Sequence, residues 1–230
     1  LIANDPAMTV KILQLVNSAF FGLGRHVSNP VDAASLLGLD VLKPLILSIG
    51  IFKQFESEKL GVEAFSLESL WAHSTRVGSL AKSIAKEEGL GSPVTEDALL
   101  AGMLHDIGKL ILVINLPEAY KALEALTLES QSDRDAAEVD AFGATHGAVG
   151  AYLLGLWGLP EPVVEAVALH NQPSMQAEKE FGMLSLVHVA NALVHEDEGA
   201  HSLEMKLNRD YLSEVGVSGR IEAWKRLVTV

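Results

Sequence analysis

Helix-boundary signals recur along the chain, and they constrain the fold more than any other feature. A polar capping residue, a proline and then apolar residues at helical spacing follow one another in "NDPAMTVKILQLV", residues 4–16, and in "SNPVDAASLLG", residues 28–38. "LDVLKPLILSIGIFKQF", residues 39–55, repeats this order with Asp40 as the cap. Signals for β-strands are nearly absent. The pattern predicts an all-α fold.

The same signals predict further helices in the rest of the chain. Ser66 begins one that ends at Gly89, and Thr95 is expected to cap a helix that carries His105 and Asp106. A later helix starts near His146. The other expected helices span residues 117–128, 133–142, 161–173, 178–196 and 218–228.

Two polar stretches predict how the chain is divided. "ESEKLGVEAFS", residues 56–66, separates an N-terminal helical lobe (1–60) from a helical core (61–200). Residues 196–210 form a second candidate linker, before a C-terminal helical extension (201–230). Because the opening "LIANDPAMTV" has no initiator methionine and resembles the middle of a domain, we expect residues to be missing upstream.

Composition excludes several classes of protein. The chain has no cysteine, so any metal must be bound by His, Asp, Glu or Asn. No apolar run reaches the roughly 18 residues that span a bilayer, and no signal peptide is visible. The formal net charge of −13 argues against binding to nucleic acid, which depends on neutralising phosphates. We therefore expect a cytoplasmic protein with no membrane or nucleic-acid partner.

Four histidines stand at the ends or on the inner faces of separate predicted helices. They occur in "WAHSTRVG", "AGMLHDIGKLIL", "FGATHGAVG" and "VALHNQP", and the second motif places Asp106 directly after its histidine. Imidazole and carboxylate groups from four helices that meet at one point suit Fe, Mn, Zn, Ni or Co.

These motifs resemble the HD superfamily of metal-dependent phosphohydrolases, and most closely its HDOD family, the HD-related output domain of bacterial signalling proteins. The similarity covers roughly residues 1–196. It rests on six blocks in the family's order, which are "DPAMTVKILQLVNSAFFG", "AASLLGLDVLKPLIL", "WAHS", "AGMLHDIGKLIL", "HGAVGAYLLGLWGLPEPVVEAVALHNQP" and "LVHVANAL".

The resemblance implies roles for particular residues. The first metal ligand of the superfamily matches His73, and its HD pair matches His105 and Asp106. Histidines that complete dinuclear sites in some members match His146 and His170. The cyclic-di-nucleotide hydrolases of the superfamily share "HDIGK" but also carry a GYP signature, which "HNQPSMQAEKEF" lacks, so we discount that activity.

Two positions depart from the superfamily pattern. The last metal ligand is usually Asp, and Asn191 stands there instead. The position after His170, often a second histidine, is Asn171. A neutral amide in place of a carboxylate weakens the attraction for a divalent cation, and Asp106 remains as the expected carboxylate ligand.

Several residues leave alternatives open. The histidines and Asp106 could form a hydrogen-bonded cluster that only pins helices together. His188 and His195 share a helix face with Asn191, and one of them could replace the lost carboxylate, although we expect both to face solvent. Lys109 could contact a phosphate, but we expect it to be solvated.

We interpret the chain as a regulatory module whose hydrolase centre is degenerate and which binds a signalling protein or a small ligand. On this interpretation no cofactor is expected. The alternative is a phosphohydrolase for a nucleotide or phosphate ester, in which a divalent metal (Fe, Mn, Zn or Ni) activates water and Asp106 and Lys109 take part in catalysis.

Overall fold

A computed structural model describes most of the residues after position 64 and part of the preceding segment. The chain divides into two compact units, Leu1–Glu58 and Lys59–Thr229, and each is described by itself. The described residues are 12, 13, 16, 27, 30–38, 46, 50, 65–130, 134–198 and 207–228.

In the first unit the structure describes one complete helix, α2 (Pro30–Leu37). Its proline start and the following Gly38, with φ of +79°, confirm the helix expected there. The expected caps of this helix and most of the helices expected over 4–16 and 39–55 lie outside the described residues.

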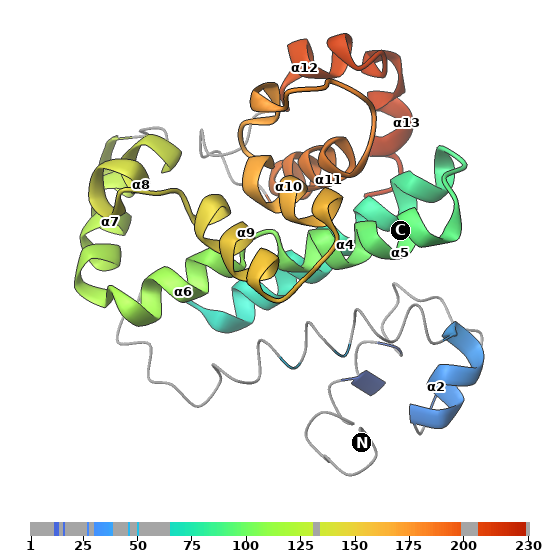
Figure 1. The fold of residues 1–230 in the computed structure, drawn as a ribbon, viewed down its shortest axis with the longest axis horizontal. Helices are drawn as coiled ribbons and strands as arrows, with labels where there is room; N and C mark the ends of the chain where they lie inside the picture. Colours follow the sequence, from blue (N-terminus) through green and yellow to red (C-terminus); the bar gives the residue numbers. More distant parts are fainter. Residues whose placement is uncertain are drawn as a thin grey trace. The chain divides into compact units, whose positions relative to one another are not determined.

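The second unit consists of helices, most of them joined by short turns, as Figure 1 shows from α4 onward; a longer segment, residues 170–182, joins α10 to α11. No β-strand occurs among the residues that the structure describes, so the all-α prediction is confirmed. The helices are α4 (Leu67–Glu87), α5 (Ser92–Leu104), α6 (Ile107–Asn115), α7 (Pro117–Ser130), α8 (Arg134–Phe142), α9 (His146–Leu156), α10 (Glu161–Leu169), α11 (Met183–Asp197), α12 (Arg209–Glu214) and α13 (Ile221–Lys225), with 3₁₀ turns at Pro173–Met175 and Ser218–Arg220.

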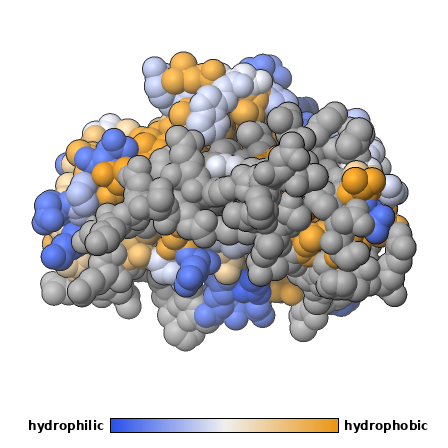
Figure 2. Space-filling view, turned by 90° about the horizontal axis from the view of Figure 1, so that it is seen from below, coloured by the Kyte–Doolittle hydropathy of each residue, from blue (hydrophilic) through white to orange (hydrophobic). Residues whose placement is uncertain are grey.

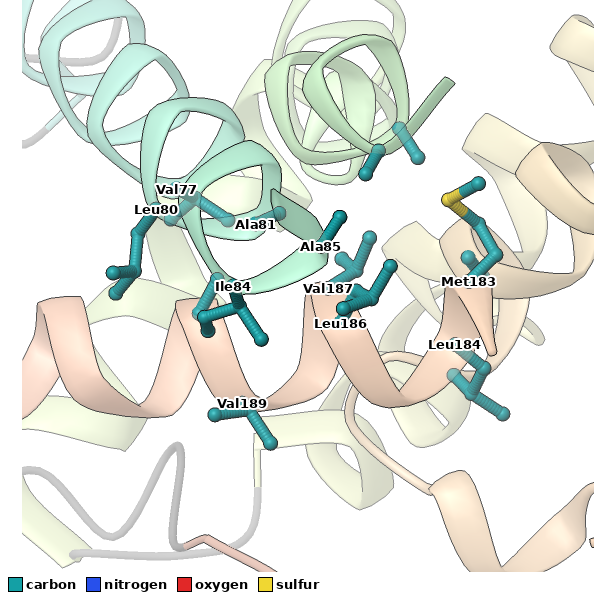
Figure 3. Packing of buried hydrophobic residues seen from close by; sticks show 14 of the residues in the cluster. Val77, Leu80, Ala81, Ile84, Ala85, Met183, Leu184, Leu186, Val187 and Val189 are labelled. Carbon is teal, nitrogen blue, oxygen red and sulfur yellow. The ribbon is translucent and has the colours of Figure 1, made fainter. Parts of the chain in front are cut away.

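The core of this unit forms where α4 packs against α5 and α11. Figure 3 shows Ile84 and Ala85 of α4 next to Leu186 and Val187 of α11. All four side chains are fully buried, and burial of each large aliphatic one contributes about 1.5–3 kcal/mol. The C-terminal helices add Trp224 to the same cluster.

Glycines allow two pairs of helices to approach closely. A Cβ atom on Gly102 of α5 would lie 2.5 Å from the Cα atom of Gly78 in α4. A Cβ atom on Gly108 of α6 would lie 1.9 Å from the carbonyl oxygen of His146 in α9. Since real Cβ atoms do not approach other atoms this closely, the backbone contacts require glycine. These contacts hold both sides of the His105–Asp106 segment against neighbouring helices.

Helix boundaries differ from the sequence predictions at several places, and three of these lie in α5, α10 and α11. The helix expected to start at Thr95 starts at Ser92, and the Thr95 hydroxyl instead donates back to the carbonyl oxygens of Leu90 and Gly91. The helix expected to reach residue 173 ends at Leu169, because proline cannot continue a helix and disfavours helical geometry in the preceding residue.

The third difference is at α11, which starts at Met183 rather than at residue 178. Gly182 precedes it with an extended backbone (φ −164°). The C-terminal end of α11 at Asp197 also shortens the polar stretch expected to begin at residue 196, and residues 199–206 lie outside the described part of the chain.

The surface of the described residues mixes polar and apolar side chains, as one face in Figure 2 illustrates. Large exposed apolar side chains include Tyr152, Leu156 and Trp157. Among the described residues, no single helix is long and apolar enough to cross a membrane. One pair, Ser92–Asn115 with Pro117–Leu126, meets the length and composition criteria only when taken together, and it is bent by 117°.

Candidate functional site

The His105–Asp106 pair lies at a break between two helices. The sequence predicted one helix carrying both residues, but α5 ends at Leu104 and α6 begins at Ile107. His105 is fully buried and Asp106 is 2% exposed. The break takes these two residues out of regular helix and places their side chains among those of neighbouring helices.

Two further predicted histidines converge on Asp106. Its Oδ1 atom lies 3.2 Å from Nε2 of His146 and 3.8 Å from Nε2 of His170. The two imidazole Nε2 atoms are 3.3 Å apart, and Nε2 of His105 lies 3.5 Å from Oδ2 of Asp106. The fold therefore brings together residues from the α5–α6 junction, the start of α9 and the end of α10.

Backbone carbonyls fix the orientation of two of these rings. Nδ1 of His105 donates to the carbonyl oxygen of Gly102 at 2.7 Å, and Nδ1 of His170 donates to that of Val167 at 2.8 Å. Burial lowers the pKa of His105 to about 3 and that of His170 well below its usual value. Both rings are therefore neutral at pH 7, with the Nε2 lone pair directed into the cluster.

His146 differs from the other two because it lies between two carboxylates. Its Nδ1 atom is 2.7 Å from Oε2 of Glu138, and its Nε2 atom faces Asp106. Burial alone would lower the pKa of His146, but hydrogen bonds to Asp106 and Glu138 raise it above its usual value. The pKa of Asp106 falls well below its usual value, because His105, Lys109 and His146 outweigh the effect of burial.

His73 reaches the cluster from α4, and both of its ring nitrogens have partners. Nε2 lies 2.9 Å from Oδ1 of Asn191 in α11, and Nδ1 lies 3.1 Å from Oε2 of Glu198. Arg76, one turn along α4, donates to Oε1 of Glu198 at 2.8 Å and also pairs with Asp197. Asn191, which the family resemblance matches to a metal-binding Asp, is thus a hydrogen-bond partner of His73.

The prediction that His188 and His195 face solvent is wrong for His188, whereas His195 is half-buried. His188 is 1% exposed; its Nδ1 atom donates to the carbonyl oxygen of His170 at 2.8 Å, and Nε2 accepts from the Asn208 backbone N–H at 2.9 Å. The ring of His195 lies 4.4 Å from that of His73, centre to centre. Burial lowers the pKa of His195 to about 4.

The expectation that Lys109 is solvated is also wrong. Its Nζ atom donates to Oδ2 of Asp106 at 2.8 Å, and its side chain is only 17% exposed. One turn of α6 separates the two residues, so the helix itself brings the ammonium group back over the carboxylate.

Sequence reasoning missed two buried charged residues. Glu138 is fully buried and accepts hydrogen bonds from the backbone N–H and from Nδ1 of His146. Arg134 pairs with Glu138 at 3.1 Å and donates to the Tyr120 hydroxyl at 2.9 Å. Their i, i+4 spacing was the available signal, but nothing in the sequence joined that pair to His146.

Asn171, the second residue that departs from the superfamily pattern, is hydrogen-bonded to a carboxylate. The side-chain amide of Asn171 donates to Oδ1 of Asp135 at 2.8 Å, and Gln172 donates to Oδ2 of the same carboxylate at 3.0 Å. Asn171 therefore links the end of α10 to the start of α8.

A pocket of about 460 Å³ opens beside the cluster in the second unit. Aromatic, cationic and acidic side chains share its wall. They include Phe65, His73, Asp106, Lys109, Tyr120, Glu124, Arg134, His195 and Glu198.

His, Asp and Glu side chains form several clusters of a kind that can hold a metal ion. Among the described residues, three ligand atoms lie within 4.8 Å of one another in each of four groups. The groups are His73–His105–Asp106, His73–His195–Glu198, Asp106–His146–His170 and Asp135–Glu138–His146.

Comparison with known proteins identifies the family. The HDOD domain matches residues 1–173, three quarters of the chain. The chain belongs to the HDOD family. An HDOD domain protein of unknown function from Geobacter sulfurreducens is 26% identical in its crystal structure; the match covers 96% of this chain and 73% of that one, with a TM-score of 0.73.

Two other relatives extend the comparison. The MmoQ response regulator of Methylococcus capsulatus is 25% identical, with a TM-score of 0.56; the match covers 100% of this chain and 87% of that one. An uncharacterized protein of Treponema pallidum is 27% identical over 93% of this chain. The chain spans only 40% of the length of that relative.

Proposed function

We propose that this HDOD domain is a signal-transduction module that acts by binding a protein partner or a small ligand, and that its inherited centre does not hydrolyse phosphate esters. Membership of the HDOD family and the similarity to a response regulator support a signalling role. Within this proposal the module works in the bacterial cytoplasm, and its partner is another signalling protein.

The bond between His73 and Asn191 carries the proposal. A hydrolytic metal centre needs the lone pair of a ring nitrogen and a carboxylate at these two places. Here Nε2 of His73 lies 2.9 Å from the amide oxygen of Asn191, so the ring donates its N–H to the amide. This hydrogen bond therefore engages the ring nitrogen that would bind the metal. It also places a neutral amide where a hydrolase would need a carboxylate ligand.

The charges around Asp106 support the same conclusion. Lys109 pairs with one carboxylate oxygen, and His146, whose pKa is raised, faces the other. Arg134 pairs with Glu138 on the far side of His146. The ammonium of Lys109 and the guanidinium of Arg134 offset negative charge that would attract a divalent metal, which supports a centre that does not hold a hydrolytic metal.

One observation favours hydrolysis as a second candidate function. Nε2 of His105 is buried without a hydrogen-bond partner within the described structure, and it lies 3.5 Å from Oδ2 of Asp106. A buried polar atom without a partner is uncommon, and a cation between these two atoms would satisfy it. A phosphohydrolase would use this pair, so the experiment must include variants of it.

A hydrolysis screen tests the proposal. The protein is stripped with a chelator, supplied in turn with Mn²⁺, Fe²⁺, Zn²⁺ and Ni²⁺, and assayed with a phosphodiester, a phosphomonoester and a panel of nucleotides. We expect the wild type to release no more product than the His105→Gln and Asp106→Asn variants. Turnover in the wild type that both variants abolish would overturn the proposal and establish the phosphohydrolase.

A further inference from the structure

Three potential metal ligands lie together in the wall of the pocket, beside the buried part of the cluster. His73 comes from α4, while His195 and Glu198 come from the last turn of α11 and the residue after it. By contrast, His105, His146 and His170 are at most 1% exposed. The pocket residues can therefore be reached without opening the core.

We propose that His73, His195 and Glu198 bind a divalent first-row transition metal ion in the wall of this pocket. Two imidazoles and one carboxylate are a ligand set that such ions favour. His195 and Glu198 lie about one and two helical turns beyond Asn191, the residue that the resemblance matches to the superfamily's last metal ligand. The inference goes beyond the proposed function, because an ion here can hold a ligand or a partner whether or not the HD pair is active.

The orientation of His73 gives the first reason. Nε2 donates its N–H to Oδ1 of Asn191, so in the neutral ring Nδ1 carries the lone pair. That atom faces Oε2 of Glu198 at 3.1 Å. Two acceptors at this distance need a proton or a cation between them. Metal-binding histidines commonly donate their second N–H to a fixed oxygen, which is what Asn191 provides.

The position of His195 gives the second reason. It precedes Glu198 by three residues, so both lie on one face of the helix end. Its ring centre is 4.4 Å from that of His73. The two rings therefore lie close enough to direct a nitrogen each toward one ion.

The local charge favours a cation. Arg76 donates to Oε1 of Glu198, which leaves Oε2 on the side of His73. Because Arg76 also pairs with Asp197, one positive charge is shared between two carboxylates, and a net negative charge remains. Asp106, by comparison, pairs with a lysine of its own.

The three ligand atoms are close enough to meet on one ion. They lie within 4.8 Å of one another. Bonds of about 2.1 Å in a tetrahedral site place ligand atoms about 3.4 Å apart, so no separation needs to shorten by more than about 1.4 Å. The Glu198 side chain is 31% exposed and has room to rotate. The remaining coordination positions would face the pocket.

Metal titration of matched variants tests the site. The protein is stripped with a chelator and titrated with Zn²⁺ against a chromophoric competitor and with Co²⁺ by visible absorption. The variants are His195→Ala and Glu198→Gln, with Glu196→Gln as the matched control and His105→Gln to report on the inherited centre. Glu196 is exposed and pairs with Lys225, away from the site. Circular dichroism confirms that each variant is folded.

We expect the wild type to bind one ion per molecule. Loss of His195 or Glu198 should weaken binding by at least about tenfold and change the Co²⁺ spectrum, while the Glu196 and His105 variants bind as the wild type does. If the wild type binds no stoichiometric ion, or if His105→Gln removes binding and Glu198→Gln does not, the proposed site is wrong. Since Glu198 is partly exposed, its variant decides the matter even if His195→Ala fails to fold.

Discussion

Nε2 of His73 lies 2.9 Å from Oδ1 of Asn191, and the family resemblance matches these two residues to a histidine and an aspartate that bind metal in the HD superfamily. The amide oxygen of Asn191 places a proton of His73 on Nε2, and Nδ1 lies 3.1 Å from Oε2 of Glu198. One change of residue type at position 191 thus alters both the ligand set and the orientation of a neighbouring ligand.

Restoring the carboxylate should restore metal binding at the inherited centre. In Asn191→Asp, the added negative charge attracts a divalent cation to His73, His105 and Asp106, and we expect Mn²⁺ or Zn²⁺ affinity to rise at least about tenfold. Equilibrium dialysis with elemental analysis measures the change. Asn115→Asp adds the same charge at an exposed helix end and should have no effect. Equal gains in both variants would contradict the account.

Gly108→Ala should destabilise the second unit. The new Cβ atom would lie 1.9 Å from the carbonyl oxygen of His146, so α6 and α9 must separate. We expect a loss of about 3 kcal/mol or more in the free energy of unfolding, measured by urea denaturation. Gly219→Ala, where no atom lies within 4 Å of the new Cβ, should stay within about 0.5 kcal/mol of the wild type. Similar losses in both would show that the helix contact is not as tight as described.

Removing the charge of Glu138 should cost stability as well. Glu138→Gln leaves the Arg134 guanidinium with one fewer anion in a buried site and weakens the acceptor for His146. We expect thermal unfolding to show a loss of about 3 kcal/mol. Exposed Glu118→Gln is the control and should be near neutral. An unchanged melting temperature for Glu138→Gln would mean that the buried network contributes little.

The metal-free protein should lose stability as pH falls below about 6.5. Burial lowers the pKa of His105 from 6.5 to about 3 in the folded state, so between these values the unfolded state binds more protons. From pH 7 to pH 5, His105 alone should remove about 2 kcal/mol of unfolding free energy. Urea denaturation at the two pH values, in the presence of a chelator, should show a smaller loss for His105→Gln. If the wild type and His105→Gln lose the same unfolding free energy between the two pH values, His105 is not the source of the pH dependence.

Local signals in the sequence were enough to predict most of the helices. Ser66 caps α4 through a hydrogen bond to the Ser69 N–H, and Gly89 ends it with φ of +70°. These features involve residues within one turn of each other, so spacing reveals them. The break at His105–Asp106 was missed because the apolar run continues through it. The break is accompanied by a close backbone contact between Gly108 and α9, and this contact cannot be seen in the sequence.

The candidate site was only partly predictable. Spacing and family resemblance singled out the histidines that converge on Asp106, and the structure brings them together. The partners that set their charge were not found, because Glu138 and Glu198 approach His146 and His73 through tertiary packing. Lys109 and His195 were expected to face solvent because amphipathic spacing does not reveal which polar residues a neighbouring helix will cover.

The protonation of His73 tests the central claim most directly. Long-range ¹H–¹⁵N correlation spectra of the chelator-treated protein at pH 7 distinguish a protonated ring nitrogen from one with a free lone pair. We predict that Nε2 of His73 carries the proton, and that added Zn²⁺ shifts Nδ1 while Nε2 stays protonated. The contrary result is that Nε2 of His73 is unprotonated and that both it and the His105 ring shift when Zn²⁺ is added. His73 would then still serve the inherited metal centre, which would contradict the account.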